Sequence, residues 1–190
     1  WDVIEQHGAD AFRWYYLTSK EPWAGYRFSS ETVGESVRKF LLTLWNTFGF
    51  LILYANTGGE SGAAAAPAAE RGDMDRWALS RLQSTVSTVC DRLDDFDATA
   101  AGRAIDEFVD DLSNWYVRSS RRRFWDAEPD AIATLRECLL TVSQLIAPFT
   151  PFIADEIYFK LAGENAAESV HLTDFTTPDT QLADAKPESD

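Results

Sequence analysis

Apolar residues recur at every third or fourth position along most of this chain, which is the spacing of amphipathic α-helices. A first long helix is predicted from Ser29 and Ser30, both good capping residues, to about Asn56. Three more long helices are predicted over about 73–93, 98–123 and 129–146, and a shorter one over 153–161. The apolar stripe of the first helix comprises Val33, Val37, Phe40, Leu41, Leu44, Trp45, Phe48 and Ile52, and that of the third comprises Ile105, Phe108, Val109, Leu112, Trp115 and Tyr116.

The segments between these helices complete the predicted architecture. Residues 57–72, "TGGESGAAAAPAAERG", are rich in Gly and Ala and predict a flexible low-complexity loop. "APFTPF" interrupts the helical pattern because proline lacks a backbone donor, and "SVHLTDF" predicts an extended strand or strap. The fold class expected is all-α: an antiparallel helical bundle over residues 28–175, with a short helical N-terminal appendage over 1–27 and a disordered tail over 176–190.

Composition narrows the classes of protein to consider. No apolar run reaches the roughly 18–20 residues of a membrane span, so we expect no membrane partner. The two cysteines are far apart in apolar-patterned segments, which favours reduced thiols and a cytoplasmic protein. Neither His7 nor His171 has a Cys or His at ligand spacing, so no metal site is predicted.

The charge of the chain is strongly negative, with one local exception. The formal charge is −14, and the imbalance of 31 acids against 17 Lys and Arg is typical of proteins kept soluble in high salt, as in halophiles. Such a background repels phosphate except at a local basic site. The exception is "NWYVRSSRRRFW", residues 114–125, where four arginines fall within six positions with no acid among them (Arg118, Arg121, Arg122 and Arg123).

A helical projection separates these four arginines. Arg118 and Arg121 fall opposite the apolar stripe and Arg122 lies at its border. Arg123 returns to the apolar side, where a charge needs a partner or the helix must leave the core. The cluster is explained either by a solvated helix end, where cations are favourable, or by contacts to phosphate. Phe124 or Trp125 could then stack on a base, or Trp125 could instead anchor the helix end in the core.

Several segments, in this order, resemble the class I aminoacyl-tRNA synthetases, and among them the isoleucyl enzymes. "GADAFRWYYLTSKEPW" is similar to the segment that follows the KMSKS catalytic loop of that family, and "RFSSETVGESVRKFLLTLWNTFGFLILYAN" to the first helix of its anticodon-binding bundle. "NWYVRSSRRRFW" resembles its central signature, and "APFTPFIADEIY" with "SVHLTDF" its closing segment. Each block is weak alone, but the ordered set covers most of residues 1–175.

The resemblance implies a bundle that docks on the anticodon stem and loop of a tRNA that accepts isoleucine. In the related methionyl enzymes a Trp after the third helix stacks on the anticodon, and Trp125 matches that position. An Asn on the first helix also faces the anticodon there, which suggests Asn46, although an Asn hydrogen-bonded within the bundle is an equal alternative. The expected tRNA contacts are therefore Arg118, Arg121, Arg122, Trp125 and Asn46, and residues 1–27 are expected to touch the inner side of the tRNA bend.

The chain lacks a HIGH-type signature, KMSKS, a Thr-rich editing segment and a Cys/His zinc constellation. We therefore expect no catalysis and no cofactor in this segment. The resemblance implies ATP and magnesium, with zinc as a further candidate, for a whole isoleucine–tRNA ligase. The catalytic domain of the same chain is the other expected partner, and a monomer is expected. Two alternatives remain: the anticodon domain of a valyl enzyme, and a structural or protein-interaction bundle that does not touch RNA.

Overall fold

The computed structural model describes residues 1–25, 29–57, 64–163 and 166–179, and every regular element within these ranges is helical. Two short helices come first, α1 (Asp2–His7) and α2 (Ala9–Thr18), followed by the 3-10 turn η1 (Pro22–Ala24). The elements after them are α3 (Ser30–Ser36), η2 (Val37–Leu41), α4 (Leu42–Thr57), η3 (Ala68–Glu70), α5 (Asp73–Asp94), α6 (Ala98–Asp110), η4 (Asp111–Val117), α7 (Arg121–Trp125), α8 (Pro129–Ile146), α9 (Pro151–Leu161) and η5 (Val170–Leu172).

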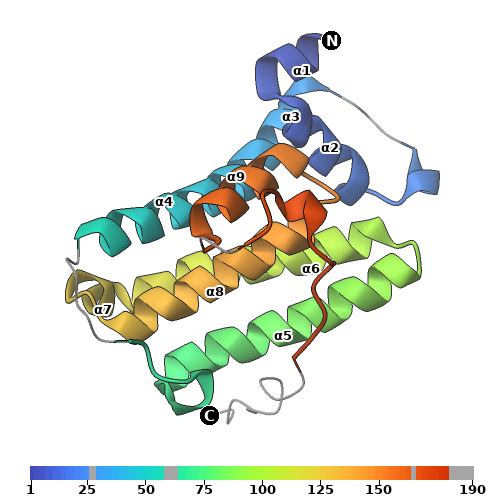
Figure 1. The fold of residues 1–190 in the computed structure, drawn as a ribbon. Coiled ribbons are helices and arrows are strands. Elements are labelled where there is room, and N and C mark those ends of the chain that lie inside the picture. The colour runs from blue at the N-terminus through green and yellow to red at the C-terminus, as the bar shows by residue number, and fades with distance from the viewer. Residues whose placement is uncertain (26–28, 58–63, 164–165, 180–190) are drawn as a thin grey trace.

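Four long helices, α4, α5, α6 and α8, lie side by side as a bundle, with α1–α3 at one end and α7 at the other (Figure 1). α4 and α6 both run toward the end of the bundle where α7 lies, and α5 and α8 run in the opposite direction (Figure 1). Their apolar stripes meet in one core, since the following side chains are no more than 2% exposed: Phe40, Leu44, Leu82, Val86, Ile105, Phe108, Leu112, Leu135, Leu139 and Val142. The predicted all-α antiparallel bundle is confirmed.

Two π-helical stretches interrupt the regular helices, and the sequence pattern did not predict them. η2 joins α3 to α4, and η4 continues α6. The π-helix bonds residue i to i+5 and turns less per residue, so an α-helical projection does not apply within it. Trp115 was placed on the apolar stripe, but its side chain is 56% exposed, with its ring centroid 6.5 Å from that of Trp77. The prediction was also wrong for Trp45, which is 42% exposed.

The third helix is not continuous to Arg123, as the sequence had suggested. It runs from α6 through η4 to residue 119, and the chain turns at Ser120 before the five-residue helix α7 begins. A turn after α7 leads to Glu128 and α8. The short helix α7 therefore crosses the end of the bundle as a separate element (Figure 1).

The N-terminal helices are fastened to the start of α9. Asp10 accepts the backbone N–H groups of Phe152 at 3.4 Å and of Ile153 at 2.8 Å, which caps that helix. Trp14 stacks on Phe40, with ring centroids 3.7 Å apart. The boundary expected between residues 27 and 28 lies outside the described residues.

Two connecting segments also lie against the bundle. In the expected loop over 57–72, positions 58–63 are outside the described residues, whereas the last part is anchored by Arg71, which is 7% exposed. After η5 the chain extends back over α5 as a strap, and the backbone N–H of Asp179 donates to Gln83 Oε1 at 2.7 Å (Figure 1). Of the expected tail, residues 180–190 are outside the described residues. None of the described helices combines the length and the apolar character that a bilayer crossing requires.

Candidate functional site

An open hollow of about 440 Å³ lies between α4 and the C-terminal half of the third helix. It brings Asn46 of α4 together with Arg118 and Arg121, three of the five predicted contact residues. The parallel course of the two helices explains this, because positions near 46 on α4 lie beside positions near 114–118 on the third helix. The complete lining is Asn46, Thr47, Phe50, Ser113, Asn114, Val117, Arg118 and Arg121.

The polar groups at this hollow are available to a ligand. Asn46 is exposed, and its amide makes no hydrogen bond to another residue of the described chain, which disfavours the alternative of a bonded Asn within the bundle. Arg118 and Arg121 are also exposed, and neither forms an ion pair with a carboxylate in the described ranges. Two guanidinium forks beside a free amide can bind phosphate and the edge of a base.

Arg122 and Trp125 lie outside this hollow, on the outer side of α7. The side chain of Arg122 is 94% exposed, and its Nε lies 3.8 Å from Asp126 Oδ2, a weak surface pair. Trp125 is 77% exposed, so it does not anchor the helix end in the core. Phe124 fills that role and is fully buried, which rules out Phe124 as a base-stacking residue.

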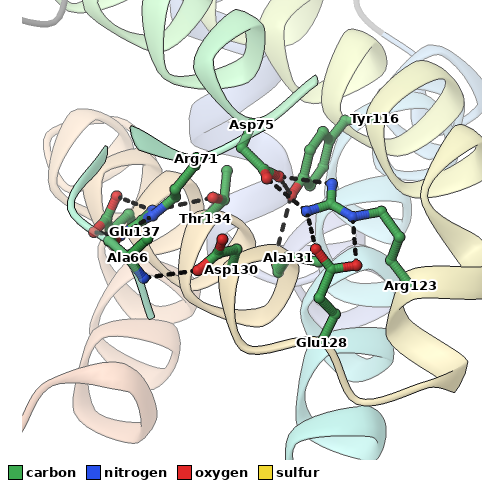
Figure 2. A network of polar contacts seen from close by, with 10 residues as sticks. All are labelled: Ala66, Arg71, Asp75, Tyr116, Arg123, Glu128, Asp130, Ala131, Thr134 and Glu137. Atoms are coloured by element: carbon green, nitrogen blue, oxygen red, sulfur yellow. Dashed lines mark hydrogen bonds and ion pairs between the residues drawn. The ribbon is translucent and has the colours of Figure 1, made fainter. Parts of the chain in front are cut away.

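Arg123 is the structural arginine of the cluster, as its place on the apolar side predicted. Its guanidinium donates to Asp75 Oδ1 at 2.9 Å and Oδ2 at 2.5 Å, and to Glu128 Oε2 at 2.9 Å and Oε1 at 2.8 Å. Tyr116 donates its hydroxyl hydrogen to Asp75 Oδ1 at 2.6 Å. Figure 2 shows the guanidinium between the two carboxylates, which come from the start of α5 and the start of α8.

Two groups of this network, the Arg123 guanidinium and the Tyr116 hydroxyl, have a raised pKa. Hydrogen bonds from Arg123 to Glu128, and then to Asp75, raise the pKa of the guanidinium further above its ordinary value. Burial, followed by the bond to Asp75, raises the pKa of the Tyr116 hydroxyl. Both groups therefore keep their protons at neutral pH, and the fully buried Asp75 is paired with a permanent cation.

A second ion pair, between the buried Arg71 and the half-exposed Glu137, lies beside the first. Arg71 contacts both carboxylate oxygens of Glu137 at 3.0 Å and donates to Thr134 Oγ1 at 3.0 Å (Figure 2). The backbone N–H of Ala66 donates to Asp130 Oδ1 at 2.7 Å. These contacts fasten the end of the 57–72 segment to α8, on the far side of Asp75 from Arg123.

Sequence reasoning missed Asn114, which lines the hollow together with Arg118 and Arg121. Asn114 lies four residues before Arg118 on the same helix, and that spacing was a signal that could have identified it, whereas Arg121 lines the hollow from α7. The side-chain amide of Asn114 donates to Asp110 Oδ1 at 2.6 Å. For Asp75 no local signal existed, because its partners are 41 and 48 positions away in the chain.

An acidic hollow of about 590 Å³ lies toward the N-terminal part of the third helix. It is lined by Lys39, Arg81, Asp106, Glu107, Asp110 and Asp111. Arg81 pairs with Asp111 at 2.7 Å. Loss of hydration in the hollow, and then the charge of Asp110, raise the pKa of Asp106. No group of three or more His, Cys, Asp or Glu in the described parts of the chain could hold a metal ion.

The sequence of this chain matches a family of known proteins. The sequence model of the anticodon-binding domain of tRNA ligase matches residues 75–189. The chain is 49% identical to an isoleucine–tRNA ligase of Deinococcus radiodurans, 48% to one of Dehalococcoides mccartyi strain 195 and 44% to one of Thermus thermophilus. These alignments include 97%, 96% and 97% of this chain, which spans only 17%, 19% and 18% of the respective ligases.

A solved structure has the same fold. It is the crystal structure of the ternary complex of the Agrobacterium radiobacter K84 AgnB2 LeuRS with tRNA and LeuAMS. The TM-score is 0.71 at 23% identity, and the match includes 96% of this chain and 21% of that one. At this identity the likeness supports the fold alone.

Proposed function

Since this chain belongs to the anticodon-binding domain family of tRNA ligases, we propose that it binds the anticodon stem and loop of a tRNA that accepts isoleucine. The bundle supplies the rigid scaffold, and the hollow between α4 and the third helix receives the RNA. The choice of isoleucine rests on the relatives at 44–49% identity, which are isoleucine–tRNA ligases.

The observation that carries this proposal is the meeting of Asn46 with Arg118 and Arg121 at one hollow. The formal charge of the chain is −14, yet two exposed arginines line this one hollow, and neither has an acidic partner in the described residues. Phosphate contacts supply most of the affinity of such interfaces, whereas amides and stacked rings add selectivity for bases. Arg118 and Arg121 are suited to the first role, and Asn46 to the second.

Trp125 and Arg122 extend the proposed surface around α7. An aromatic side chain that is 77% exposed next to a basic site has the geometry of a stacking platform for an unpaired base. Arg122 contributes less, because Asp126 partly neutralises it and it lies outside the hollow.

The activity of a longer polypeptide is part of the same proposal. It would ligate isoleucine to its tRNA with ATP and magnesium in the cytoplasm, as a monomer, using a catalytic domain outside this segment. Trp1 and Ile4 are 91% and 37% exposed, and we expect the N-terminal helices to face that domain. The segment itself binds and does not catalyse.

The test is a binding titration with the 190-residue chain and a labelled anticodon stem-loop of an isoleucine tRNA, at a stated salt concentration. Replacing Arg118, Arg121 and Arg122 with Ala should weaken binding by about 100-fold, because each exposed, salt-screened contact to phosphate contributes about 1 kcal/mol. The thermal midpoint should stay close to that of the wild type, since all three residues are exposed.

A matched control replaces Arg76, Arg92 and Arg103, which lie on other parts of the bundle, and should leave binding unchanged. Stronger binding of a valine stem-loop would reassign the domain to the valyl alternative, and equal binding of the two stem-loops would indicate a nonspecific binder. If the wild-type chain retains no stem-loop and chemical probing shows no protected anticodon nucleotide, the structural bundle becomes the better explanation.

A further inference from the structure

The five residues of α7 divide into two groups by the direction of their side chains. Arg121, Arg122 and Trp125 are exposed, whereas Phe124 is fully buried and only 25% of the Arg123 side chain is exposed. Three of the proposed RNA contacts thus stand on a helix too short to be stable alone. Whatever fastens α7 to the bundle also decides where those three side chains point.

The turn that leads into α7 does not hold the helix by itself. Ser120 is buried, but its hydroxyl finds no hydrogen-bond partner within the described residues. The backbone N–H of Phe124 reaches Ser120 O at a rather long 3.2 Å. Additional contacts from elsewhere in the bundle must therefore set the orientation of α7.

The turn that leaves α7 depends on Arg123 and Glu128. The backbone N–H of Glu128 donates to Arg123 O at 2.9 Å, and that of Ala127 donates to Phe124 O at 3.0 Å. This closure places Ala127 at φ +52°, in the left-handed region that disfavours residues with a Cβ. The side-chain pair between Arg123 and Glu128, 2.8 Å long, spans the same turn.

Two side chains of α7 face the bundle: Phe124 makes apolar contacts and Arg123 makes polar ones. Phe124 packs edge-to-face on Phe50 and on Tyr116, with ring centroids 5.0 and 6.2 Å apart. Arg123 contributes direction, because its planar fork meets both oxygens of Asp75, which Tyr116 also fixes. A buried ion pair contributes little net stability compared with apolar packing, but it constrains geometry strongly.

We propose that Arg123 is a positioning residue for tRNA binding: through Asp75 and Glu128 it sets α7 so that Arg121 and Trp125 meet the RNA together. The inference rests on the proposed function. Arg123 itself does not touch the RNA. The two carboxylates reach it from α5 and α8, so the clamp ties α7 to two helices of the bundle at once (Figure 2).

The test is a double-mutant cycle between Arg123→Lys and Trp125→Ala, read as stem-loop affinity of the 190-residue chain. Lysine keeps the charge near Asp75 but loses the fork, so the fold should persist while α7 loses its fixed orientation. Trp125→Ala should cost about tenfold in the wild-type background, because one stacked base is lost. In the Arg123→Lys background the same change should cost less than about twofold.

Arg71→Lys is the matched control, since it alters the other buried arginine, whose carboxylate partner also lies on α8. Arg71→Lys should lower the thermal midpoint about as much as Arg123→Lys does. It should leave the tenfold effect of Trp125→Ala intact. Amide hydrogen exchange gives a readout without RNA: exchange within 121–126 should accelerate in Arg123→Lys and not in Arg71→Lys.

The outcomes separate the two proposals. A wild-type chain that does not bind the stem-loop refutes the proposed function, and the positioning role falls with it. If the wild type binds and the Trp125→Ala effect is equally large in both backgrounds, Arg123 is merely structural. If the Trp125→Ala effect also shrinks in the Arg71→Lys background, general destabilisation explains the result. That outcome would also overturn the positioning role.

Discussion

The two hollows along the third helix differ in charge, and only the third helix contributes to both: α4 and α7 complete the first, and η2 and α5 complete the second. Toward the C-terminal end, Arg118 and Arg121 meet Asn46. Toward the N-terminal end, four carboxylates line the hollow with only two cations, Lys39 and Arg81. The hydrogen bond from Asn114 to Asp110, 2.6 Å long, joins the two linings.

The difference in charge between the two hollows shows how a strongly acidic chain can bind a polyanion locally. Net charge acts at long range and is screened within about 8 Å at physiological salt, so the groups within one or two turns decide the local potential. The basic end attracts phosphate and the acidic end repels it. We therefore expect the acidic hollow to set one edge of the RNA footprint.

The largest expected effect comes from reversing the charge of the basic end. Arg118→Glu with Arg121→Glu should reduce stem-loop affinity by more than about 100-fold, because two attractive contacts become repulsive. The salt dependence of the remaining binding should flatten, since fewer counterions are released. Fluorescence anisotropy at several salt concentrations measures both quantities, and unchanged affinity would remove this hollow from the interface.

A smaller effect should separate two exposed residues on the same side of the first long helix. Asn46→Ala should weaken binding by about tenfold, the loss of one base-directed amide. Lys39→Ala, two turns earlier at the acidic hollow, should change affinity by less than about twofold. The same titration compares the two variants, and a larger loss from Lys39→Ala would reverse the proposed placement of the RNA.

Neutralising the acidic end should act in the opposite direction and more weakly. Asp106→Asn with Asp110→Asn should strengthen binding of any RNA stem-loop by about two- to threefold, since a screened repulsion is removed. Preference for the isoleucine stem-loop over an unrelated one should fall at the same time. Competition between the two RNAs measures that preference, and weaker binding by the neutral variant would show that these carboxylates contact the RNA favourably.

The smallest effect concerns stability and pH. The pKa of Asp106 is raised in the folded state by lost hydration and by Asp110, with Lys39 opposing and Glu107 adding to the rise. Below the ordinary value of 3.8 both states hold the proton, but as pH rises the unfolded state releases it first, so the folded state loses stability. Asp106→Asn should therefore gain at most about 0.5 kcal/mol near neutral pH and nothing in strong acid. Urea unfolding at neutral and at strongly acidic pH measures the free energy of unfolding of both proteins. An equal gain in acid would rule out titration of Asp106 as the cause.

Much of the candidate site could be predicted from local pattern. The spacing of apolar residues was enough to place α5, α8 and α9, because each buries one face against the rest of the bundle. The same projection placed Arg118 and Arg121 outward and Arg123 inward. Each of these predictions depends on one helix at a time.

What failed depended on interactions between helices. Trp45 and Trp115 were assigned to the core, but the π-helical stretches and the packing of neighbouring helices leave both exposed. The sequence predicted a flexible loop over residues 57–72. Arg71 is nevertheless buried, because it donates hydrogen bonds to Thr134 and Glu137 on α8.

By itself the sequence determined the helices, their apolar faces and the outward direction of two arginines, since these follow from the period of a helix. Only the tertiary structure decided that Asn46 lies beside Arg118 and Arg121. That proximity needs α4 and the third helix to run in parallel, and no local spacing encodes the relation between residues 72 positions apart. The pairing of Arg123 with Asp75 was decided in the same way, because Asp75 lies 48 positions away in the chain and its buried carboxylate needs a cation beside it.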